Sequence, residues 1–245
     1  ESLPNNTTGQ DDVAVGDKAM FENTSGDGNT AVGREALMHN TTADSNTAVG
    51  YHAMRTNTTG GNNVAIGYQA LYTGIVGNTV AIGYKALYAN GDTGYNNTAV
   101  GYLSLTANTT GDSNTALGRE TLEANTGGTG NTALGKAAMH ANTTGATNVA
   151  VGFNAMEQNT TGSHNTAIGD GALNANTTAD NNTAIGRQAL VANTTGHSNV
   201  AVGANALDAK TSLSTITPSK SKIIFLIIIF VLLFFYIQIY LTTQD

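Results

Sequence analysis

The chain has 245 residues, a formal net charge of -7 and charged side chains at 11% of its positions. It contains 29 glycines but no cysteine or tryptophan, which excludes a disulfide framework and thiolate chemistry. The repeats are acidic and carry no basic stripe, which argues against nucleic acid as a partner.

One short sequence motif, Asn-Thr-Ala-Val-Gly at residues 46–50, recurs with small variations along most of the chain. Its Ala-aliphatic-Gly core occurs in twelve copies, and nine of the eleven intervals between them are 17 residues. The two exceptions are adjacent, 16 residues before Gly83 and 18 after it, so the period is restored at once. The copies end at Gly16, Gly33, Gly50, Gly67, Gly83, Gly101, Gly118, Gly135, Gly152, Gly169, Gly186 and Gly203. A fixed short period is the signature of a repeat fold, and its strict phase argues against disorder.

Each unit combines a short strand such as residues 47–49, a glycine, a second short segment such as 52–54, and a polar Asn-Thr-Thr-Gly turn. Helices are excluded because glycine and β-branched residues recur in every unit and no 3.6-residue period is sustained. We therefore predict an all-β protein, a parallel β-solenoid (β-roll) of about twelve 17-residue coils over residues 13–209. Residues 1–12 are expected to form a partial repeat that caps its N-terminal end.

The columns of the repeat indicate how the coils pack. Alanine stands two residues before every glycine, Val, Ile or Leu one before it, and Leu or Met four after it. Because side chains alternate across a strand, the alanine and aliphatic columns should face opposite ways. Both columns are apolar, so we expect both faces to be buried, the second against another chain. The asparagine seven residues after ten of the twelve glycines suits a turn and a stacked amide ladder.

The composition changes after the repeats. Residues 210–222 form a polar linker, and residues 223–241 are apolar apart from Gln238, long enough to cross a bilayer as one helix. Tyr236 and Tyr240 fit an interfacial aromatic belt, and residues 242–245 form a short tail. A buried core helix or an oligomer stalk is the alternative interpretation of this segment.

The orientation of this predicted helix is open. Lys220 and Lys222 at its N-terminal flank favour a cytoplasmic repeat array, whereas a signal peptide cleaved before Glu1 would give the opposite orientation. A glycosylphosphatidylinositol signal is a third interpretation, because small residues and a spacer precede the apolar segment.

The phrase Asn-Val-Ala-Ile-Gly at residues 63–67, with its relatives before Gly83, Gly152 and Gly203, resembles the head repeat of trimeric autotransporter adhesins. The resemblance covers about residues 5–210 and implies a left-handed parallel β-roll that assembles as a homotrimer. Similar repeats occur in fibre-like proteins of phages and large DNA viruses. The longer unit and the single apolar segment in place of an outer-membrane barrel favour a viral or eukaryote-associated membrane protein.

No catalytic, cofactor-binding or metal site is predicted, and the protein is not expected to be an enzyme. The histidines stand at different repeat phases, which favours exposed surface positions, and the aspartates are too sporadic for a calcium-binding β-roll. These residues are His39, His52, His140, His164 and His197, and Asp27, Asp44, Asp112 and Asp180. Glu35 and Glu120 share a phase but lie five coils apart, so no acid–base pair is indicated.

Two sets of residues are candidate sites. Four consecutive coils carry a tyrosine directly after the glycine, which predicts an aromatic ladder that either stabilises the stack or binds a glycan or partner. These residues are Tyr51, Tyr68, Tyr84 and Tyr102. Asn-x-Thr sequons are candidate N-glycosylation sites, although turn chemistry alone accounts for them. They occur at Asn40, Asn57, Asn108, Asn142, Asn159, Asn176 and Asn193.

These observations predict a membrane-anchored structural fibre or adhesin-like module on a virion or cell surface. The expected partners are two further copies of the chain, the lipid bilayer, and a glycan, receptor or capsid protein. One alternative is a virion structural protein that links an internal membrane to the capsid. Another is an ice- or glycan-binding β-solenoid, although the strand threonines alternate with valine.

Overall fold

The computed structural model describes residues 1–74, 77–91 and 93–208. The chain divides into two units, Glu1–Thr211 and Ser212–Asp245. The predicted linker (210–222), transmembrane helix (223–241) and tail (242–245) lie outside the described residues. So do Ile75 and Val76 of the irregular interval before Gly83.

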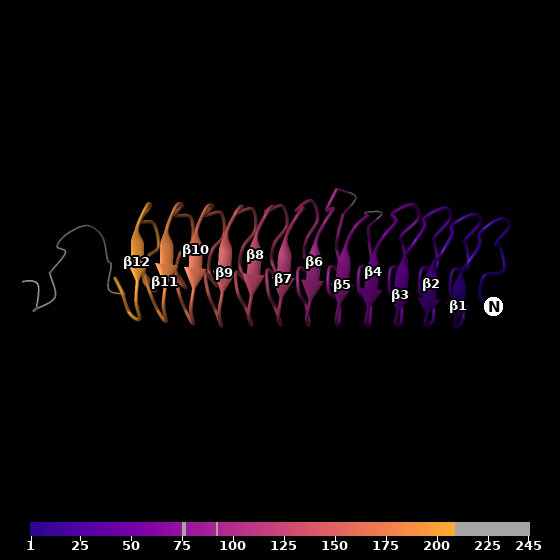
Figure 1. The fold of residues 1–245 in the computed structure, drawn as a ribbon, viewed down its shortest axis with the longest axis horizontal. Coiled ribbons are helices and arrows are strands. Elements are labelled where there is room, and N and C mark those ends of the chain that lie inside the picture. The colour runs from indigo at the N-terminus through magenta and orange to yellow at the C-terminus, as the bar shows by residue number, and fades with distance from the viewer. Residues whose placement is uncertain (75–76, 92, 209–245) are drawn as a thin grey trace, which may run out of the picture. The chain divides into compact units, whose positions relative to one another are not determined.

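The repeat array is a parallel β-solenoid, as the sequence predicts. One three-residue strand per unit joins a twelve-stranded parallel sheet in which the strands follow chain order (Figure 1). The strands are β1 (Val13–Val15), β2 (Thr30–Val32), β3 (Thr47–Val49), β4 (Val64–Ile66), β5 (Val80–Ile82), β6 (Thr98–Val100), β7 (Thr115–Leu117), β8 (Thr132–Leu134), β9 (Val149–Val151), β10 (Thr166–Ile168), β11 (Thr183–Ile185) and β12 (Val200–Val202). Alanine pairs with alanine at every step, including Ala65 with Ala81 and Ala81 with Ala99 across the irregular intervals. The loops therefore absorb the changes in length.

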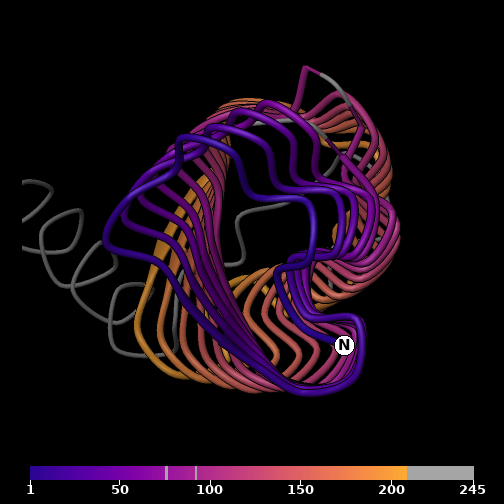
Figure 2. The same cartoon turned by 90° about the vertical axis from the view of Figure 1, so that its right-hand side faces the viewer.

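The interior of each coil is narrow and built mainly from alanine and from one Leu or Met side chain. The central alanine of each strand points inward and is fully buried from Ala31 to Ala184. The Leu or Met four residues after each glycine is the largest side chain inside the coil, and it is 0–1% exposed from Met20 to Leu190. Viewed along its axis, the array shows successive coils superimposed with a gradual rotation from one end to the other (Figure 2).

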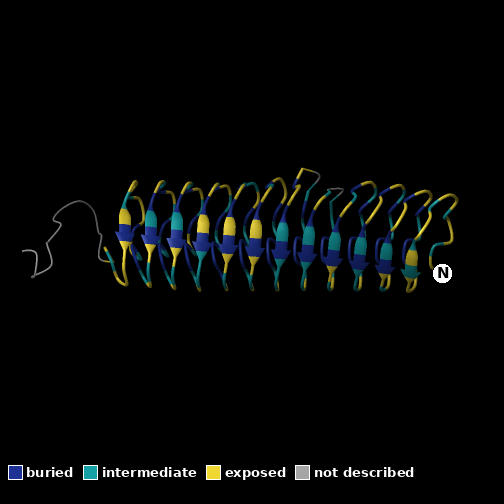
Figure 3. Cartoon of the chain, viewed as in Figure 1, coloured by how far each residue is buried: buried dark blue, intermediate teal, exposed yellow. Residues whose placement is uncertain are grey.

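The outer face of the sheet carries the aliphatic column, and within the single chain this face is not buried. Val15 is 57% exposed, Leu117 45% and Ile168 39%. Figure 3 shows the resulting alternation, with a buried centre and more exposed ends on β2 to β12; in β1 the central Ala14 is only partly buried. The expected opposite orientation of the two columns is confirmed, while the expected burial of the aliphatic face is not met inside one chain.

The second segment of each unit is a turn rather than a strand. The Leu or Met at its end has a left-handed backbone, with φ between 47° and 54° in all twelve units. This conformation costs roughly 1–2 kcal/mol for a residue with a side chain. It aims the backbone N–H at the next coil; Met54 N donates to Ala70 O at 3.0 Å and Met139 N to Ala155 O at 2.9 Å. These inter-coil hydrogen bonds offset the cost.

The glycine of each unit stands where two coils meet most closely. Gly152 has φ +138°, and a Cβ added to it would lie 2.5 Å from the carbonyl oxygen of Gly169 in the next coil. Neither the backbone angle nor the space admits a side chain. The glycine column is therefore required by the stacking of the coils.

Candidate functional site

The tyrosines that follow the glycine in four consecutive coils form one continuous stack. The ring centroids of Tyr51 and Tyr68 are 5.3 Å apart, those of Tyr68 and Tyr84 5.3 Å, and those of Tyr84 and Tyr102 5.2 Å. The planes of neighbouring rings differ by only 7–11°. The in-register pairing of the coils produces this arrangement because it places equivalent positions directly above one another. We call these four residues the tyrosine row.

Arginine guanidinium groups cover both ends of the tyrosine row. Arg34 lies over the Tyr51 ring at 5.8 Å, and Arg119 lies over the Tyr102 ring at 5.4 Å. Each arginine stands directly after its coil's glycine, so the row begins and ends with a cation–π contact. Each also pairs with the following glutamate: Arg34 with Glu35 at 3.2 Å and Arg119 with Glu120 at 2.7 Å.

A second, shorter aromatic stack runs beside the row. The rings of Tyr72 and Tyr88 are 5.2 Å apart, and Lys85 Nζ lies 5.6 Å from the Tyr84 ring and 5.1 Å from the Tyr88 ring. Lys85 therefore bridges the two stacks with its ammonium group.

The ring faces of the row are largely occupied by other rings and by the terminal arginines. The exposed fractions of the four residues are 37% for Tyr51, 44% for Tyr68, 41% for Tyr84 and 45% for Tyr102. Since neighbouring groups lie over the faces, we assign the exposed fraction to the ring edges and the phenolic hydroxyls. A sugar cannot stack on the faces of the inner rings, so any ligand must be recognised at the edge.

A compact ionic cluster adjoins the N-terminal end of the row. Glu35 is 7% exposed, and its Oε2 accepts a hydrogen bond from Arg55 Nε at 2.7 Å. His52 Nε2 lies 3.0 Å from the same oxygen, in an alignment that is poor for a hydrogen bond. The His52 ring stacks on Tyr51 with a centroid distance of 3.7 Å.

The cluster shifts the pKa values of its members. The hydrogen bond from Arg55 lowers the pKa of Glu35 and raises that of Arg55 itself. Burial lowers the pKa of His52, and the attraction of Glu35 opposes this shift only in part. The arrangement therefore holds an ionised glutamate beside a neutral imidazole.

Four of the five histidines pair with a carboxylate one coil earlier, which the sequence interpretation missed. His39 Nδ1 lies 2.9 Å from Glu22, His52 Nε2 3.0 Å from Glu35, His140 Nε2 3.3 Å from Glu123, and His197 Nδ1 3.9 Å from Asp180. In each pair the carboxylate stands 17 residues before the histidine. This 17-residue spacing could have revealed the pairs in the sequence. They were missed because the histidines were compared only with one another and not with the acidic residues one repeat earlier. His164 is exposed as expected, whereas the His52 side chain is only 15% exposed.

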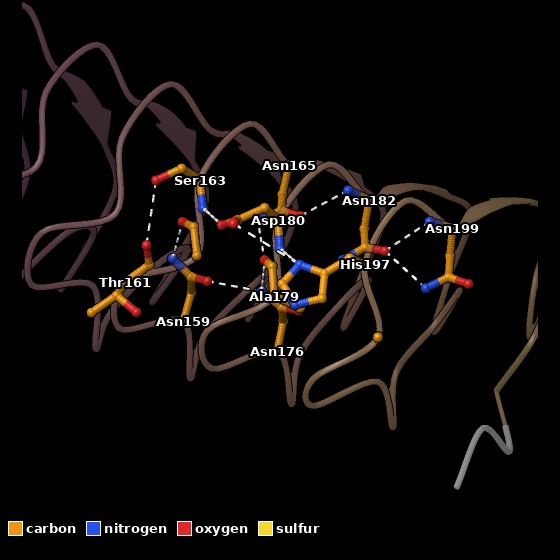
Figure 4. A network of polar contacts seen from close by, with 12 residues as sticks. Asn159, Thr161, Ser163, Asn165, Asn176, Ala179, Asp180, Asn182, His197 and Asn199 are labelled. Carbon is orange, nitrogen blue, oxygen red and sulfur yellow. Dashed lines mark hydrogen bonds and ion pairs between the residues drawn. The ribbon is translucent and has the colours of Figure 1, made fainter. Parts of the chain in front are cut away.

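The predicted amide ladder is present, and a second one accompanies it. In the first, Nδ2 donates to the preceding Oδ1 at Asn40 and from Asn108 to Asn193; the distance from Asn159 to Asn142 is 2.8 Å. No such bond joins Asn57 to Asn40, whose Oδ1 has no hydrogen-bond partner. In the second, at the asparagine four residues before each glycine, the backbone N–H donates to the preceding Oδ1, as from Asn165 to Asn148 at 2.9 Å. Figure 4 shows both near the C-terminal end of the array, with Ser163, Asp180 and His197 forming a third chain of contacts.

The sequon asparagines are members of the first ladder. Their side chains lie inside the coil and are 0–3% exposed. Asn142 Nδ2, for example, donates to Asn125 Oδ1 at 2.8 Å and to Gly145 O at 3.0 Å. A glycan on this nitrogen would have to leave the interior of the coil. The folded array therefore does not accommodate glycans at the seven candidate positions.

Within the described residues, no three histidine or acidic side chains converge in a way that could hold a metal ion. The same part of the chain contains no helix with the length and hydropathy needed for a membrane span. Glu35 and Glu120 remain in separate coils; Arg34 and Arg55 engage Glu35, and Arg119 engages Glu120.

No family model matches the chain, and neither a curated protein nor a solved structure matches it. The geometry of the surface is therefore the basis for a functional conclusion.

Proposed function

We propose that the protein is a non-enzymatic, membrane-anchored structural fibre that serves as an attachment module on a virion or cell surface. The observation that carries the proposal is the aliphatic column on the outer face of the sheet, one residue before each glycine. We call it the apolar row. It consists of Val15, Val32, Val49, Ile66, Ile82, Val100, Leu117, Leu134, Val151, Ile168, Ile185 and Val202.

The apolar row is unusual for the surface of a monomer. At about 4.8 Å per strand it extends for roughly 50 Å. Monomeric soluble proteins rarely expose contiguous apolar patches larger than a few hundred Å², and larger ones mark interaction surfaces. A second and third copy of the chain, each presenting the same row, would bury it along a common axis. The number three rests on the resemblance to the trimeric adhesin repeat.

The membrane anchor rests on the sequence of residues 223–241, which are apolar apart from Gln238. A regular rod ending in such a segment suits a fibre that projects from a bilayer. The buried asparagine amides form hydrogen bonds between neighbouring coils, which suits a structural scaffold.

The experiment is a mass measurement of the full chain in detergent micelles by light scattering. We expect three copies of the 25.1 kDa chain. The double change Ile168→Asp and Ile185→Asp should reduce the mass to one copy, because charges would enter the apolar interface. Thr144→Asp, at an exposed turn position, is the matched control and should leave the mass unchanged. A single-copy mass for the unaltered chain would contradict the proposal.

A second candidate is a virion structural protein that stands on an internal membrane beneath a capsid. Lys220 and Lys222 favour it, because positive residues flank the cytoplasmic side of membrane helices. Protease treatment of sealed vesicles separates the two functions. Digestion of the array by external protease supports the cytoplasmic orientation when the vesicles are cytoplasmic side out. Protection supports the surface-exposed fibre.

A further inference from the structure

We propose that the tyrosine row binds an extended acidic polysaccharide along its exposed edge. The inference names the ligand class of the attachment module and so rests on that proposed function. Its readout, glycan binding, is separate from the mass of the assembly.

The row presents a regular set of hydrogen-bond donors. Its ring faces are occupied by neighbouring rings and by Arg34 and Arg119, whereas the residues remain 37–45% exposed. An aromatic ring carries partial positive charge at its edge, and a phenolic hydroxyl donates one hydrogen bond. Four such edges in line form a surface suited to oxygen-rich, negatively charged groups.

The charges around the row point to an anionic ligand. Arg34, Lys85 and Arg119 all lie over rings of the row. Arg34 and Arg119 also pair with Glu35 and Glu120, whereas Lys85 has no ion pair among the described residues. Between Asp44 and Asp112 the sequence contains only one acidic residue, Asp92. This stretch contrasts with the acidic remainder of the repeats, and such a local field favours the approach of an anion.

The spacing of the row selects among anionic polymers. Its rings repeat every 5.2–5.3 Å. Residues on one side of an extended peptide repeat every 6.6 Å or so, which is two steps of about 3.3 Å, so a peptide falls out of step by over 1 Å per ring. Single-stranded nucleic acid binds through bases stacked on aromatic faces, and the inner faces here are occupied. An extended β-1,4-linked pyranose chain with equatorial linkages advances by close to one sugar per ring and keeps step across all four coils. Successive sugars face opposite ways, so carboxylates on one side of the chain meet every second tyrosine.

The test measures binding of a six-sugar β-1,4-linked oligomannuronate to the full chain in detergent micelles by calorimetry at low ionic strength. The double change Tyr68→Phe and Tyr84→Phe keeps both rings in the stack and removes only the hydroxyls. We expect it to weaken binding at least about tenfold, because each hydroxyl donates to a charged or hydroxylated sugar. Arg34→Gln combined with Arg119→Gln should weaken binding and reduce its dependence on salt.

Tyr88→Phe and Tyr95→Phe are matched controls outside the row and should leave the affinity unchanged. Cellohexaose, a neutral chain with the same linkage, should bind at least about tenfold more weakly, since it lacks the charge-assisted hydrogen bonds. No binding of the oligomannuronate overturns the inference, as does equal binding by the row variant or by polyglutamate. A single-copy mass with intact glycan binding would overturn the trimer alone, and a three-copy mass without glycan binding would overturn this inference alone.

Discussion

Two regions of the array use the same backbone template and different side chains to join their coils. In the segment of residues 103–208, here called the amide segment, both asparagine ladders run without interruption, from Asn108 to Asn193 and from Asn114 to Asn199. In the segment of residues 51–102, here called the aromatic segment, each ladder lacks one asparagine. Gly74 stands in place of a member of the first ladder and Thr79 in place of a member of the second.

The tyrosine row spans these missing positions. It connects the coils before, within and after the irregular intervals through rings 5.2–5.3 Å apart, and the Tyr72–Tyr88 pair adds a second stack. In both segments, equivalent side chains of adjacent coils are in contact. Either amides or aromatic rings can make these contacts. The aromatic segment does so on its surface, which leaves ring edges available for a ligand.

The largest effect is expected where the two segments are alike, at the glycine column. Gly67→Ala in the aromatic segment and Gly152→Ala in the amide segment should each lower the free energy of unfolding by about 4 kcal/mol, from backbone strain and a clash with the next coil. In both, the added Cβ would lie 2.5 Å from a glycine carbonyl oxygen. Urea unfolding followed by circular dichroism measures the loss. Unequal losses would show that one segment tolerates separation of its coils.

Gly130→Ala is the control for this prediction. Gly130 also has positive φ, +64°, but the atom nearest to an added Cβ is Thr147 Oγ1 at 3.9 Å. The change should cost only about 1 kcal/mol, the penalty of the left-handed conformation alone.

The next largest effect should distinguish the segments. Asn142→Ala removes the donor to Asn125 Oδ1 and one of the two acceptors of the Asn159 amide, which keeps its hydrogen bond to Gly162 O. Gly145 O also loses one donor and keeps the other, Asn131 Nδ2. With one buried oxygen unpaired and three hydrogen bonds lost, we expect a loss of about 2–3 kcal/mol, confined to the amide segment. Hydrogen exchange resolved by mass spectrometry would locate the faster exchange in the coils around Asn142.

The reverse change tests the aromatic segment. Thr79→Asn restores an asparagine to the second ladder between Asn63 and Asn97, and should stabilise the chain by about 1 kcal/mol. A destabilised variant would mean that the shortened coil has no room for the amide, so that aromatic rings supply the side-chain contact in its place.

The fold could be predicted closely from the sequence because its columns repeat. The alanine, aliphatic and glycine columns determine which face is inside, and the 17-residue interval determines which residues become neighbours. The conformation of the second short segment at residues 52–54 was left open, because a left-handed Met54 is stabilised by the hydrogen bond that it donates to another coil. The cluster of Glu35, His52 and Arg55 was missed for a related reason. Its members are neighbours only after the coils are stacked, and a period applied to single residue types does not pair glutamate with histidine.

A moderate effect is expected from loss of one ring of the tyrosine row. Tyr68→Ala removes two stacked contacts at a partly exposed site, so the free energy of unfolding should fall by about 1–2 kcal/mol. Tyr68→Phe keeps both contacts and should be nearly neutral. Exchange of backbone amides should quicken in the aromatic segment and remain unchanged in the amide segment. Uniform destabilisation of both segments would contradict the local role of the row.

The smallest effect is a dependence of the aromatic segment on pH. Burial lowers the pKa of His52, so the folded state favours the neutral imidazole. The contribution of His52 is therefore fully present above its ordinary pKa of about 6.5 and is lost progressively as the pH falls from that value through the lowered pKa of the folded state. Arg34 and Arg55 add to this loss, because they repel the protonated ring, while Glu35 moderates it.

Hydrogen exchange at pH 7.5 and 5.5, corrected for the intrinsic rate, should show coils around His52 opening more readily at the lower pH. The pKa of Glu35 is lowered in the folded state, so the stability that its ionised form contributes is lost only below about pH 4.3. This range is separate from that of His52. His52→Gln removes the titrating ring and should abolish the difference between pH 7.5 and 5.5 in these coils. If the glutamine variant retains the full difference, the acid sensitivity belongs to another group, and the cluster serves only as an anchor for the end of the tyrosine row.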